Sequence, residues 1–226
     1  MNSFEASYPR SETLVQSFMQ RVYQWMAAGL ALTGFIAFWA SGNAGMMRAL
    51  QGGLFFVLVI AELGLVLWLS TQVMKISATA ATIGFLVYSA LNGLTLSFIF
   101  LMYTQASIAS TFFVTAGTFA GVSLYGWTTK KDLTSMGSFL FMGLIGIIIA
   151  SVVNFFLNSP ALYWIITYAG VAIFVGLTAY DTQRLKEVHR RNPEAPDQLA
   201  ILGALRLYLD FINLFIMLLR VMGNRR

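Results

Sequence analysis

Three carboxylates lie in parts of the sequence where a charge is costly. Glu62, Asp181 and Asp210 fall within or directly against long apolar runs, whereas the other acidic residues fall in polar segments. An ionised side chain at the centre of a bilayer costs at least about 2.5–3.5 kcal/mol on insertion scales. Such a residue therefore faces a protein interior or a water-filled cavity, where it can attract cations and exchange protons.

Asp210 lies midway along the last apolar run. At about 100° per residue, one side of this helix carries Gly203, Arg206, Asp210 and Asn213, while the opposite side is Leu, Ile, Phe and Met. A charged stripe on an otherwise apolar helix favours a place in the middle of a bundle, with the stripe lining a pathway. The alternative is that Arg206 and Asp210 only neutralise each other at i, i+4 spacing.

For each of the other two carboxylates, a purely structural role is an alternative to a place in a cation pathway. Asp181 directly follows the sixth apolar run, so it could be an interfacial carboxylate that pairs with Arg184. Glu62 is in the middle of the second run with no basic residue within four positions, so it must be protonated or partnered by another helix. A neutral Glu62 that only holds helices together is the alternative there.

Small and polar residues elsewhere in the runs indicate helix packing. Gly84, Tyr88, Asn92 and Thr95 share one face of the third run, which favours interhelical hydrogen bonds over ligand binding. The pair Gly117 and Gly121 forms a GxxxG motif, a packing signal.

Seven hydrophobic helices must position these groups. The chain has 226 residues, 58% of them apolar and 10% charged, whereas a soluble domain carries about a quarter charged residues. A water-soluble globular enzyme is therefore excluded. The charge-free stretches Ile76–Thr129 and Leu133–Tyr180 span 54 and 48 residues, and each holds two spans of about 20 residues joined by a turn, at 104–107 and 158–160. The predicted all-α fold has spans at about 22–40, 50–70, 78–103, 108–127, 137–157, 161–180 and 199–220.

The spans form one predicted transmembrane domain, residues 22–220. Before it we expect a cytoplasmic tail, residues 1–21, and after it a basic tail, residues 221–226. The first run is expected to be a retained span and not a cleaved signal peptide. The mixed-charge stretch Thr182–Gln198, with two prolines, is expected to be a solvated inner loop.

The distribution of Lys and Arg predicts a cytoplasmic N-terminus, because basic residues gather on the inner side of a membrane. Only Arg48 falls on the outer side of the first six spans in this orientation. Seven full crossings would also place Arg220, Arg225 and Arg226 outside, so the last helix either crosses against the rule or is re-entrant. The predicted inner residues are Arg10, Arg21, Lys75, Lys130, Lys131, Arg184, Lys186, Arg190, Arg191 and Arg206.

Several other chemistries are excluded. The chain has no cysteine, so disulfides, Fe–S clusters and thiolate metal sites are absent. Its net charge of +5 lies between the apolar runs, so no nucleic-acid partner is expected. The single histidine, His189, falls in the predicted inner loop, so we expect no zinc cluster and no Ser–His pair in the membrane. No cofactor is predicted.

Three segments resemble signatures of the transmembrane Bax-inhibitor-motif family. They are the last helix from Leu207 to Arg220, the segment Thr178–Arg184 around Asp181, and the inner loop Thr129–Leu133. The similarity runs from about Arg21 to the end of the sequence and is strongest to the bacterial inner-membrane branch. Location in a bacterial cytoplasmic membrane follows from this resemblance.

The resemblance implies a seven-helix fold with six helices around the last one. It also implies a cation leak, principally for Ca²⁺, that is controlled by pH through Asp181 and Asp210. Glu62 matches the acidic position of the family on the second helix. Some members carry an arginine at the inner end of that helix that latches onto the aspartate pair. This chain departs from that pattern, so Lys75 or Arg206 would have to serve, with Asn213 and Arg184 as supporting residues.

Carboxylate chemistry fits this function. Calcium takes about six to eight oxygen ligands, so three carboxylates at different depths cannot complete a cage. They can instead form a weak passage completed by water, which conduction requires. Two carboxylates held close together in a low dielectric cannot both ionise freely, and they titrate as a coupled pair. Proton occupancy of the pair is hypothesised to select between a closed and an open inner end.

Two functions of other classes remain as alternatives. Intramembrane aspartyl proteases also place aspartates on helices six and seven, and Tyr180-Asp181 matches half of their motif. The other half needs Gly-x-Gly before the aspartate, whereas residues 207–209 are Leu-Tyr-Leu. The remaining alternative is a non-transporting protein that restrains another membrane protein, such as a membrane protease or a stress-response component. The expected partners are therefore the lipid bilayer, Ca²⁺ and H⁺, with other membrane proteins under the second alternative.

Overall fold

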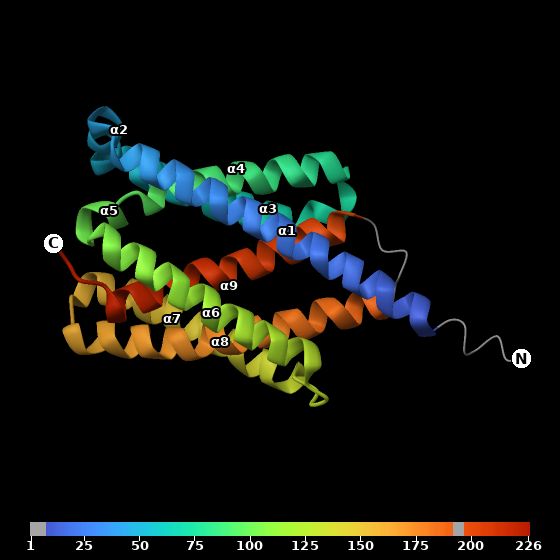
Figure 1. Cartoon of the computed structure of the whole chain (residues 1–226). Helices are drawn as coiled ribbons and strands as arrows, with labels where there is room; N and C mark the ends of the chain where they lie inside the picture. The colour runs from blue at the N-terminus through green and yellow to red at the C-terminus, as the bar shows by residue number, and fades with distance from the viewer. Residues whose placement is uncertain (1–7, 192–196) are drawn as a thin grey trace, which may run out of the picture. The chain divides into compact units, whose positions relative to one another are not determined.

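The computed structural model describes residues 8–191 and 197–226, and these residues form helices joined by short connections, with no strand (Figure 1). Residues 1–7 of the predicted N-terminal tail and residues 192–196 of the predicted loop lie outside the described residues. The elements in order are α1 (Tyr8–Ser41), α2 (Ala44–Ala49), the π-helix η1 (Leu50–Leu54), α3 (Phe55–Gln72), the 3₁₀-helix η2 (Val73–Lys75), α4 (Ala78–Leu96), α5 (Ile99–Met102), α6 (Gln105–Thr128), α7 (Thr134–Leu157), α8 (Pro160–Arg191) and α9 (Gln198–Met222).

Seven of the described helical segments are long and apolar enough to cross a membrane, which confirms the predicted fold class. A helix rises about 1.5 Å per residue, so even the shortest of them, at 24 residues, exceeds the roughly 30 Å hydrocarbon core. The segments are Thr13–Ser41, Ala44–Lys75, Ala78–Met102, Gln105–Thr128, Thr134–Leu157, Pro160–Arg191 and Gln198–Met222.

The helices break at both predicted turns, although residues 105–107 of the first turn already belong to α6, and local chemistry explains both breaks. The side chain of Thr104 caps α6 by accepting a hydrogen bond from the Ser107 N–H at 3.3 Å. Helix α7 ends at Leu157, and the following Asn158 adopts the left-handed conformation (φ 50°, ψ 34°) that asparagine tolerates better than most residues. Helix α8 then begins at Pro160, where the missing N–H would be unpaired in any case.

Helix α8 extends beyond the predicted sixth span, so the expectation of a solvated loop from residue 182 is wrong for residues 182–191. Leu185 and His189 are buried one turn apart, whereas Arg184 and Arg190 are exposed, so this part of α8 is amphipathic. Charged residues in the stretch mark the polar face of a helix. At the other end of the chain, α1 already begins at Tyr8, well before the first predicted span.

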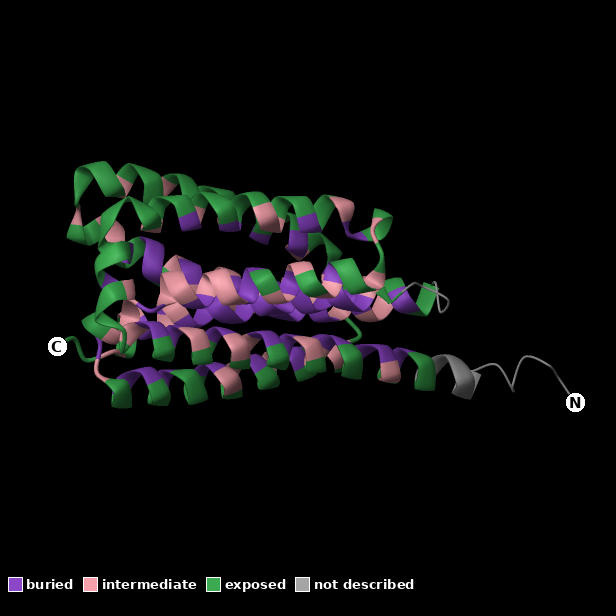
Figure 2. Ribbon diagram, turned by 90° about the horizontal axis from the view of Figure 1, so that it is seen from above, coloured by how far each residue is buried: buried purple, intermediate pink, exposed green. Residues whose placement is uncertain are grey.

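The outward faces of the helices are apolar. Exposed positions run along the length of several helices (Figure 2), and many of them are large hydrophobic residues, such as Phe113 (74% exposed) and Phe139 (70%). This pattern is expected where acyl chains and not water cover the surface. Helix α9 differs, because 67% of its apolar window is buried against 11–33% for the other six segments. The arrangement of six helices around α9 stays a prediction.

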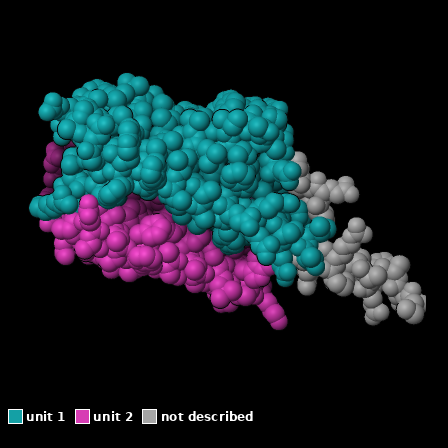
Figure 3. Space-filling view, turned by 45° about the horizontal axis from the view of Figure 1, so that its top comes forward, with its two compact units in different colours: residues 1–103, 188–208, 226 teal, residues 104–187, 209–225 magenta. Residues whose placement is uncertain are grey.

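The chain divides into two compact units (Figure 3). Unit 1 contains the described parts of residues 1–103 and 188–208 together with Arg226, and unit 2 contains residues 104–187 and 209–225. Within unit 1, α1 and α4 pack closely at Gly93, where an added methyl group would lie 2.7 Å from the Thr33 carbonyl oxygen.

Unit 2 has its own close contact and apolar core. A methyl group on Gly126 of α6 would overlap the backbone carbonyl of Ala179 on α8. By contrast, a methyl group on Gly117 or Gly121 would meet nothing within 4 Å. The GxxxG pair therefore packs against no other helix among the described residues, and the prediction that it is a packing motif is wrong. The buried core of the unit joins α7, α8 and α9, and consists of Leu140, Ile147, Ile166, Phe174, Leu177, Leu214 and Met217.

The last helix is continuous from Gln198 to Met222, and its residues from 209 onward belong to unit 2. Its following residue Asn224 is hydrogen-bonded to Thr104 and Ser107 at the start of α6, at 3.1 and 3.0 Å. The 129–133 loop, which joins α6 to α7, lies at the other end of α6. Within unit 2, the end of α9 is therefore opposite this loop, with Arg220 and Arg225 at the end away from Lys130 and Lys131. A full crossing by the last helix stays a prediction.

Candidate functional site

Glu62 is buried on α3 and bonded to α4. It is 9% exposed, and the side-chain amide of Asn92 donates a hydrogen bond to its Oε2 at 3.2 Å. Its other oxygen, Oε1, is buried and accepts no hydrogen bond from the described residues. The prediction that Asn92 forms an interhelical hydrogen bond is confirmed, and the expected partner of Glu62 on another helix is this amide.

A third helix fixes the Asn92 amide. The Tyr208 hydroxyl of α9 donates to Asn92 Oδ1 at 3.0 Å, and Thr33 Oγ1 of α1 lies 2.7 Å from the same hydroxyl oxygen. The rings of Phe85 and Tyr88 meet the Tyr208 ring edge to face at centroid distances of 5.7 and 5.9 Å. Tyr208 therefore joins α1, α4 and α9 around Glu62 within unit 1.

Asp181 lies half-buried on α8, among contacts to α6 and α7. The hydroxyl of the next residue, Thr182, is fully buried and lies 3.2 Å from the hydroxyl of Ser123 on α6. The ring of the preceding residue, Tyr180, packs so closely on Gly137 of α7 that a methyl group there would overlap it. Small residues on α6 and α7 thus allow this part of α8 to approach closely.

Asp210 is deeply buried on α9, with 5% of its surface exposed. The next residue, Phe211, packs against α6, with its ring centroid 5.5 Å from those of Phe112 and Phe119. Asp210 is held in an environment from which bulk water is largely excluded.

Helix α6 relates the two aspartates to each other. Thr182, beside Asp181, contacts Ser123, and Phe211, beside Asp210, contacts Phe119. Phe211 lies equally close to Phe112 and Phe119, so it meets α6 between these two residues, roughly 6–11 Å along the helix axis from Ser123. The backbones next to the two aspartates therefore meet α6 within about two turns of each other in unit 2.

The four predicted supporting residues differ in their surroundings. Arg184 donates a hydrogen bond to the Tyr180 hydroxyl at 3.0 Å and lies over that ring. Asn213 donates to the Leu209 carbonyl of its own helix at 2.8 Å. Arg206 is half-buried on α9, and Lys75 is exposed at the end of η2. A latch formed by Arg206 or Lys75 stays a prediction.

Gln183 was not singled out from the sequence, yet it joins two of the three family-like segments. Its Oε1 accepts a hydrogen bond from the Leu133 N–H at 2.9 Å, and its Nε2 donates to the Lys131 carbonyl at 2.8 Å. Lys186, one turn further along α8, donates to the Trp127 carbonyl at 2.6 Å. The segment around Asp181 therefore holds the loop that contains Lys130 and Lys131.

His189 is in a different environment from the predicted loop. It is 2% exposed and stacks on Phe18, with ring centroids 4.2 Å apart and planes 4° from parallel. Within the described residues, no three His, Asp or Glu side chains gather into a group able to hold a metal ion. Any divalent cation at the carboxylates would therefore draw most of its oxygen ligands from water and the backbone.

Seven apolar helices with buried carboxylates define a polytopic membrane protein with ionisable groups in its interior. The family model described as "Inhibitor of apoptosis-promoting Bax1" matches residues 15–226. The chain therefore belongs to this Bax inhibitor family, as its resemblance to the family predicted.

Relatives of similar length support this assignment. The chain is 54% identical to inner membrane protein YbhL of Escherichia coli, over 97% of this chain and 99% of that protein. It is 45% identical to an uncharacterized protein of Borreliella burgdorferi, over 96% of both chains. It is also 36% identical to an uncharacterized membrane protein of Streptococcus pyogenes, over 96% of both. None of these three relatives carries the name of an enzyme.

Proposed function

We propose that this chain is a multi-pass protein of the bacterial inner membrane, with a cytoplasmic N-terminus, that acts as a pH-sensitive cation leak and not as an enzyme. The conducted ion is principally Ca²⁺, and protonation of Asp181 and Asp210 controls the leak. The inner-membrane location is supported by the similarity to YbhL of Escherichia coli. The orientation is supported by the predicted bias of basic residues.

One observation carries the mechanism. The residues next to Asp181 and Asp210 contact the same stretch of α6, at Ser123 and between Phe112 and Phe119, within about two helical turns. Two carboxylates held near each other in an apolar bundle are difficult to ionise together, because each raises the cost of charging the other. The pair then takes up protons as one unit, and its charge changes with pH.

The charge of the pair sets its attraction for a cation. A doubly ionised pair attracts Ca²⁺ from water, and protonation weakens this attraction. Protonation also weakens the hold of the pair on a basic latch, for which Arg206 and Lys75 are the proposed residues. These two effects act in opposite directions on flux, so the proposal specifies a pH dependence that resides in the pair.

Calcium flux in liposomes tests this proposal. The purified protein is reconstituted around a calcium-sensitive dye, and the initial rate of entry is measured from pH 5 to 8, with and without a proton gradient. Asp210→Asn removes the ionisable group with little change in volume, so the pH dependence of the rate is expected to flatten. Asp181→Asn is expected to have the same effect, because the pair titrates as a unit.

Asp132→Asn is the matched control. Asp132 is an exposed aspartate at the start of α7, where its Oδ1 accepts a hydrogen bond from the Thr134 N–H at 2.8 Å. This variant is expected to keep the pH profile of the wild type.

An unchanged pH profile in Asp210→Asn would rule out the proposed control of the leak by the aspartate pair. A wild-type protein that moves no ion at any pH favours the non-transporting interaction protein, and cleavage of a membrane substrate that depends on Asp210 would support the protease.

A further inference from the structure

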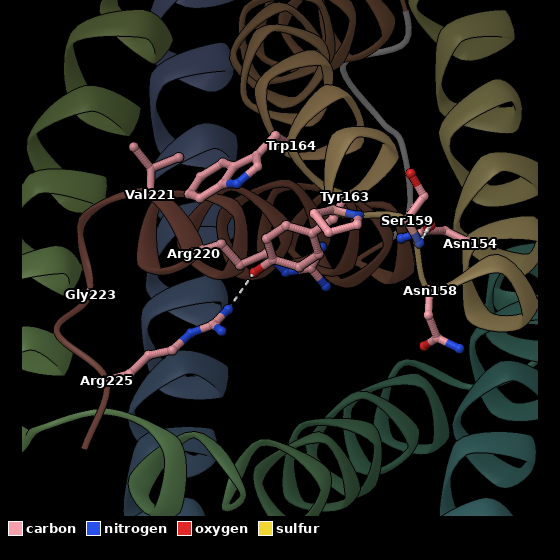
Figure 4. Close-up of a pocket in the computed structure, with 10 residues that line it drawn as sticks. Asn154, Asn158, Ser159, Tyr163, Trp164, Arg220, Val221, Gly223 and Arg225 are labelled. Atoms are coloured by element: carbon pink, nitrogen blue, oxygen red, sulfur yellow. Dashed lines mark hydrogen bonds between the residues drawn. The ribbon is translucent and has the colours of Figure 1, made fainter.

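An open pocket lies in unit 2, where the turn between α7 and α8 meets the segment after α9 (Figure 4). Its volume is about 580 Å³. The turn side supplies Asn154, Asn158 and Ser159, and the facing side supplies Arg220 and Arg225. This pocket is separate from the carboxylates of the proposed leak, because it lies at the ends of the helices and not along them.

The pocket is positively charged. Two of its ten lining residues are arginines and none is acidic. Both arginines contact Tyr163. The guanidinium carbon of Arg220 lies 5.3 Å from the centre of the Tyr163 ring, and that of Arg225 lies 5.9 Å from it. Arg225 Nη2 also donates a hydrogen bond to the Tyr163 hydroxyl at 3.0 Å. Two like charges held at one ring repel each other, and a bound anion relieves that repulsion.

The opposite wall is rigid and polar. Asn154 Oδ1 accepts a hydrogen bond from the Ser159 N–H at 2.9 Å, and the Asn158 N–H donates to the Asn154 carbonyl at 2.8 Å. These bonds fix the two-residue turn. The pocket is therefore preformed, with hydrogen-bonding groups on one side and guanidinium groups on the other.

The surroundings of the pocket are apolar and exposed. Phe155 and Phe156, at the end of α7, are 71% and 75% exposed, and Ile165, one turn into α8, is 64% exposed. Trp164 lines the pocket itself, and tryptophan and tyrosine are enriched at the level of lipid headgroups. A ligand in this pocket thus has charged groups around its head and lipid-facing residues beside it.

We infer that this pocket binds the phosphate of an anionic phospholipid. Guanidinium groups bind phosphate oxygens through paired N–H donors, and basic pockets between transmembrane helices hold anionic headgroups. The site also accounts for two basic residues at the end of unit 2 opposite Lys130 and Lys131, where the positive-inside rule disfavours them. Free phosphate shares the headgroup chemistry but has no acyl chains to lie against Phe155 and Phe156.

Native mass spectrometry of the purified full-length chain tests this inference. The detergent-solubilised protein is titrated with phosphatidylglycerol or phosphatidylcholine of the same acyl chains, and bound lipid is counted. The wild type is expected to bind phosphatidylglycerol about tenfold more tightly, and Arg220→Gln and Arg225→Gln are each expected to lose about fivefold of this affinity. Arg48→Gln, an exposed arginine on the same predicted side, is the matched control and should bind as the wild type does.

Folding and the source of the phosphate are controlled separately. Arg225 is exposed, so Arg225→Gln should keep the melting temperature of the wild type while losing lipid. Equal binding of the two lipids, or full retention of phosphatidylglycerol by both arginine variants, overturns the inference. A third arm adds inorganic phosphate at the lipid concentration: failure to displace the lipid supports a lipid site, and complete displacement shows a free-anion site and overturns it.

Discussion

Tyr208 donates its hydroxyl hydrogen to the side-chain carbonyl of Asn92 at 3.0 Å, and this bond decides which way the Asn92 amide faces. With its oxygen turned to Tyr208, the amide must present its N–H groups to Glu62. An aromatic residue on α9 thereby sets the hydrogen bonding of a carboxylate on α3.

Removal of the Tyr208 hydroxyl should weaken unit 1. Tyr208→Phe keeps the buried ring but removes the hydroxyl that donates to Asn92 Oδ1 and lies beside Thr33 Oγ1. The free energy of unfolding is therefore expected to fall by about 1–2 kcal/mol. The melting temperature of the detergent-solubilised protein should therefore fall. Tyr168→Phe is the control, because Tyr168 is 59% exposed. Equal melting temperatures for the two variants would show that the hydrogen bond does not stabilise the fold.

A methyl group at Gly126 should separate α6 from α8. The added carbon overlaps the Ala179 backbone carbonyl, which cannot rotate away, so Gly126→Ala is expected to destabilise unit 2 by about 1–3 kcal/mol. Gly121→Ala lies on the same helix and meets nothing within 4 Å, so it should be neutral or slightly stabilising, because alanine favours helix more than glycine. Thermal unfolding of both variants distinguishes these effects, and destabilisation by Gly121→Ala alone contradicts the prediction.

Loss of the Gln183 side chain should release the loop between α6 and α7. Gln183→Leu removes the acceptor of the Leu133 N–H and the donor to the Lys131 carbonyl. Trypsin should then cleave after Lys130 or Lys131 several-fold faster, because local unfolding exposes the backbone. Gln72→Leu, on α3 of unit 1, is the matched control. Unchanged cleavage rates in Gln183→Leu would mean that the loop is held by other contacts.

The absence of cysteine makes the orientation easy to measure. Single cysteines at Asn158 and Lys130 lie at opposite ends of unit 2, and a charged maleimide labels only those that face the outside of right-side-out vesicles. We expect labelling of Asn158→Cys and no labelling of Lys130→Cys until the vesicles are opened, as the positive-inside rule predicts. The reverse pattern would invert the proposed topology.

Glu62 can be tested without loss of its hydrogen bond. Glu62→Gln keeps a carbonyl oxygen to accept from Asn92 but removes the possibility of charge. If Glu62 contributes to the cation passage, calcium flux should fall several-fold while the melting temperature stays close to that of the wild type. A lower melting temperature with unchanged flux would instead indicate a structural role.

The helical spans could be predicted because the membrane imposes a strict rule. A charge inside the bilayer is so costly that charge-free stretches delimit the helices, and the turns at Thr104 and Asn158 follow from residues that end or begin helices. The extension of α8 to Arg191 could not be predicted in the same way. Outside the membrane a charge carries no such penalty, so residues 182–191 look equally like a loop or like the polar face of a helix.

Contacts between helices were harder to predict than the helices themselves. Periodicity correctly placed Asn92 on a polar face, but nothing in it names Glu62 and Tyr208 as its partners on α3 and α9. The same limit explains the glycines: Gly117 and Gly121 have the spacing of a packing motif, yet Gly126 makes the close contact. The spacing of residues along a helix predicts which of them share a face, but the residues that contact this face depend on how the helices pack in the folded protein.

The connection between α7 and α8 has a consequence for biosynthesis. Only Asn158 and Ser159 separate two helices of 24 and 32 residues, so the connection is too short to let one helix lie far from the other. We expect the two to be inserted together as a hairpin, with the turn translocated as its tip in the proposed orientation. A ribosome-bound chain is therefore expected to release this pair from the translocon in a single step, after both helices have been synthesised.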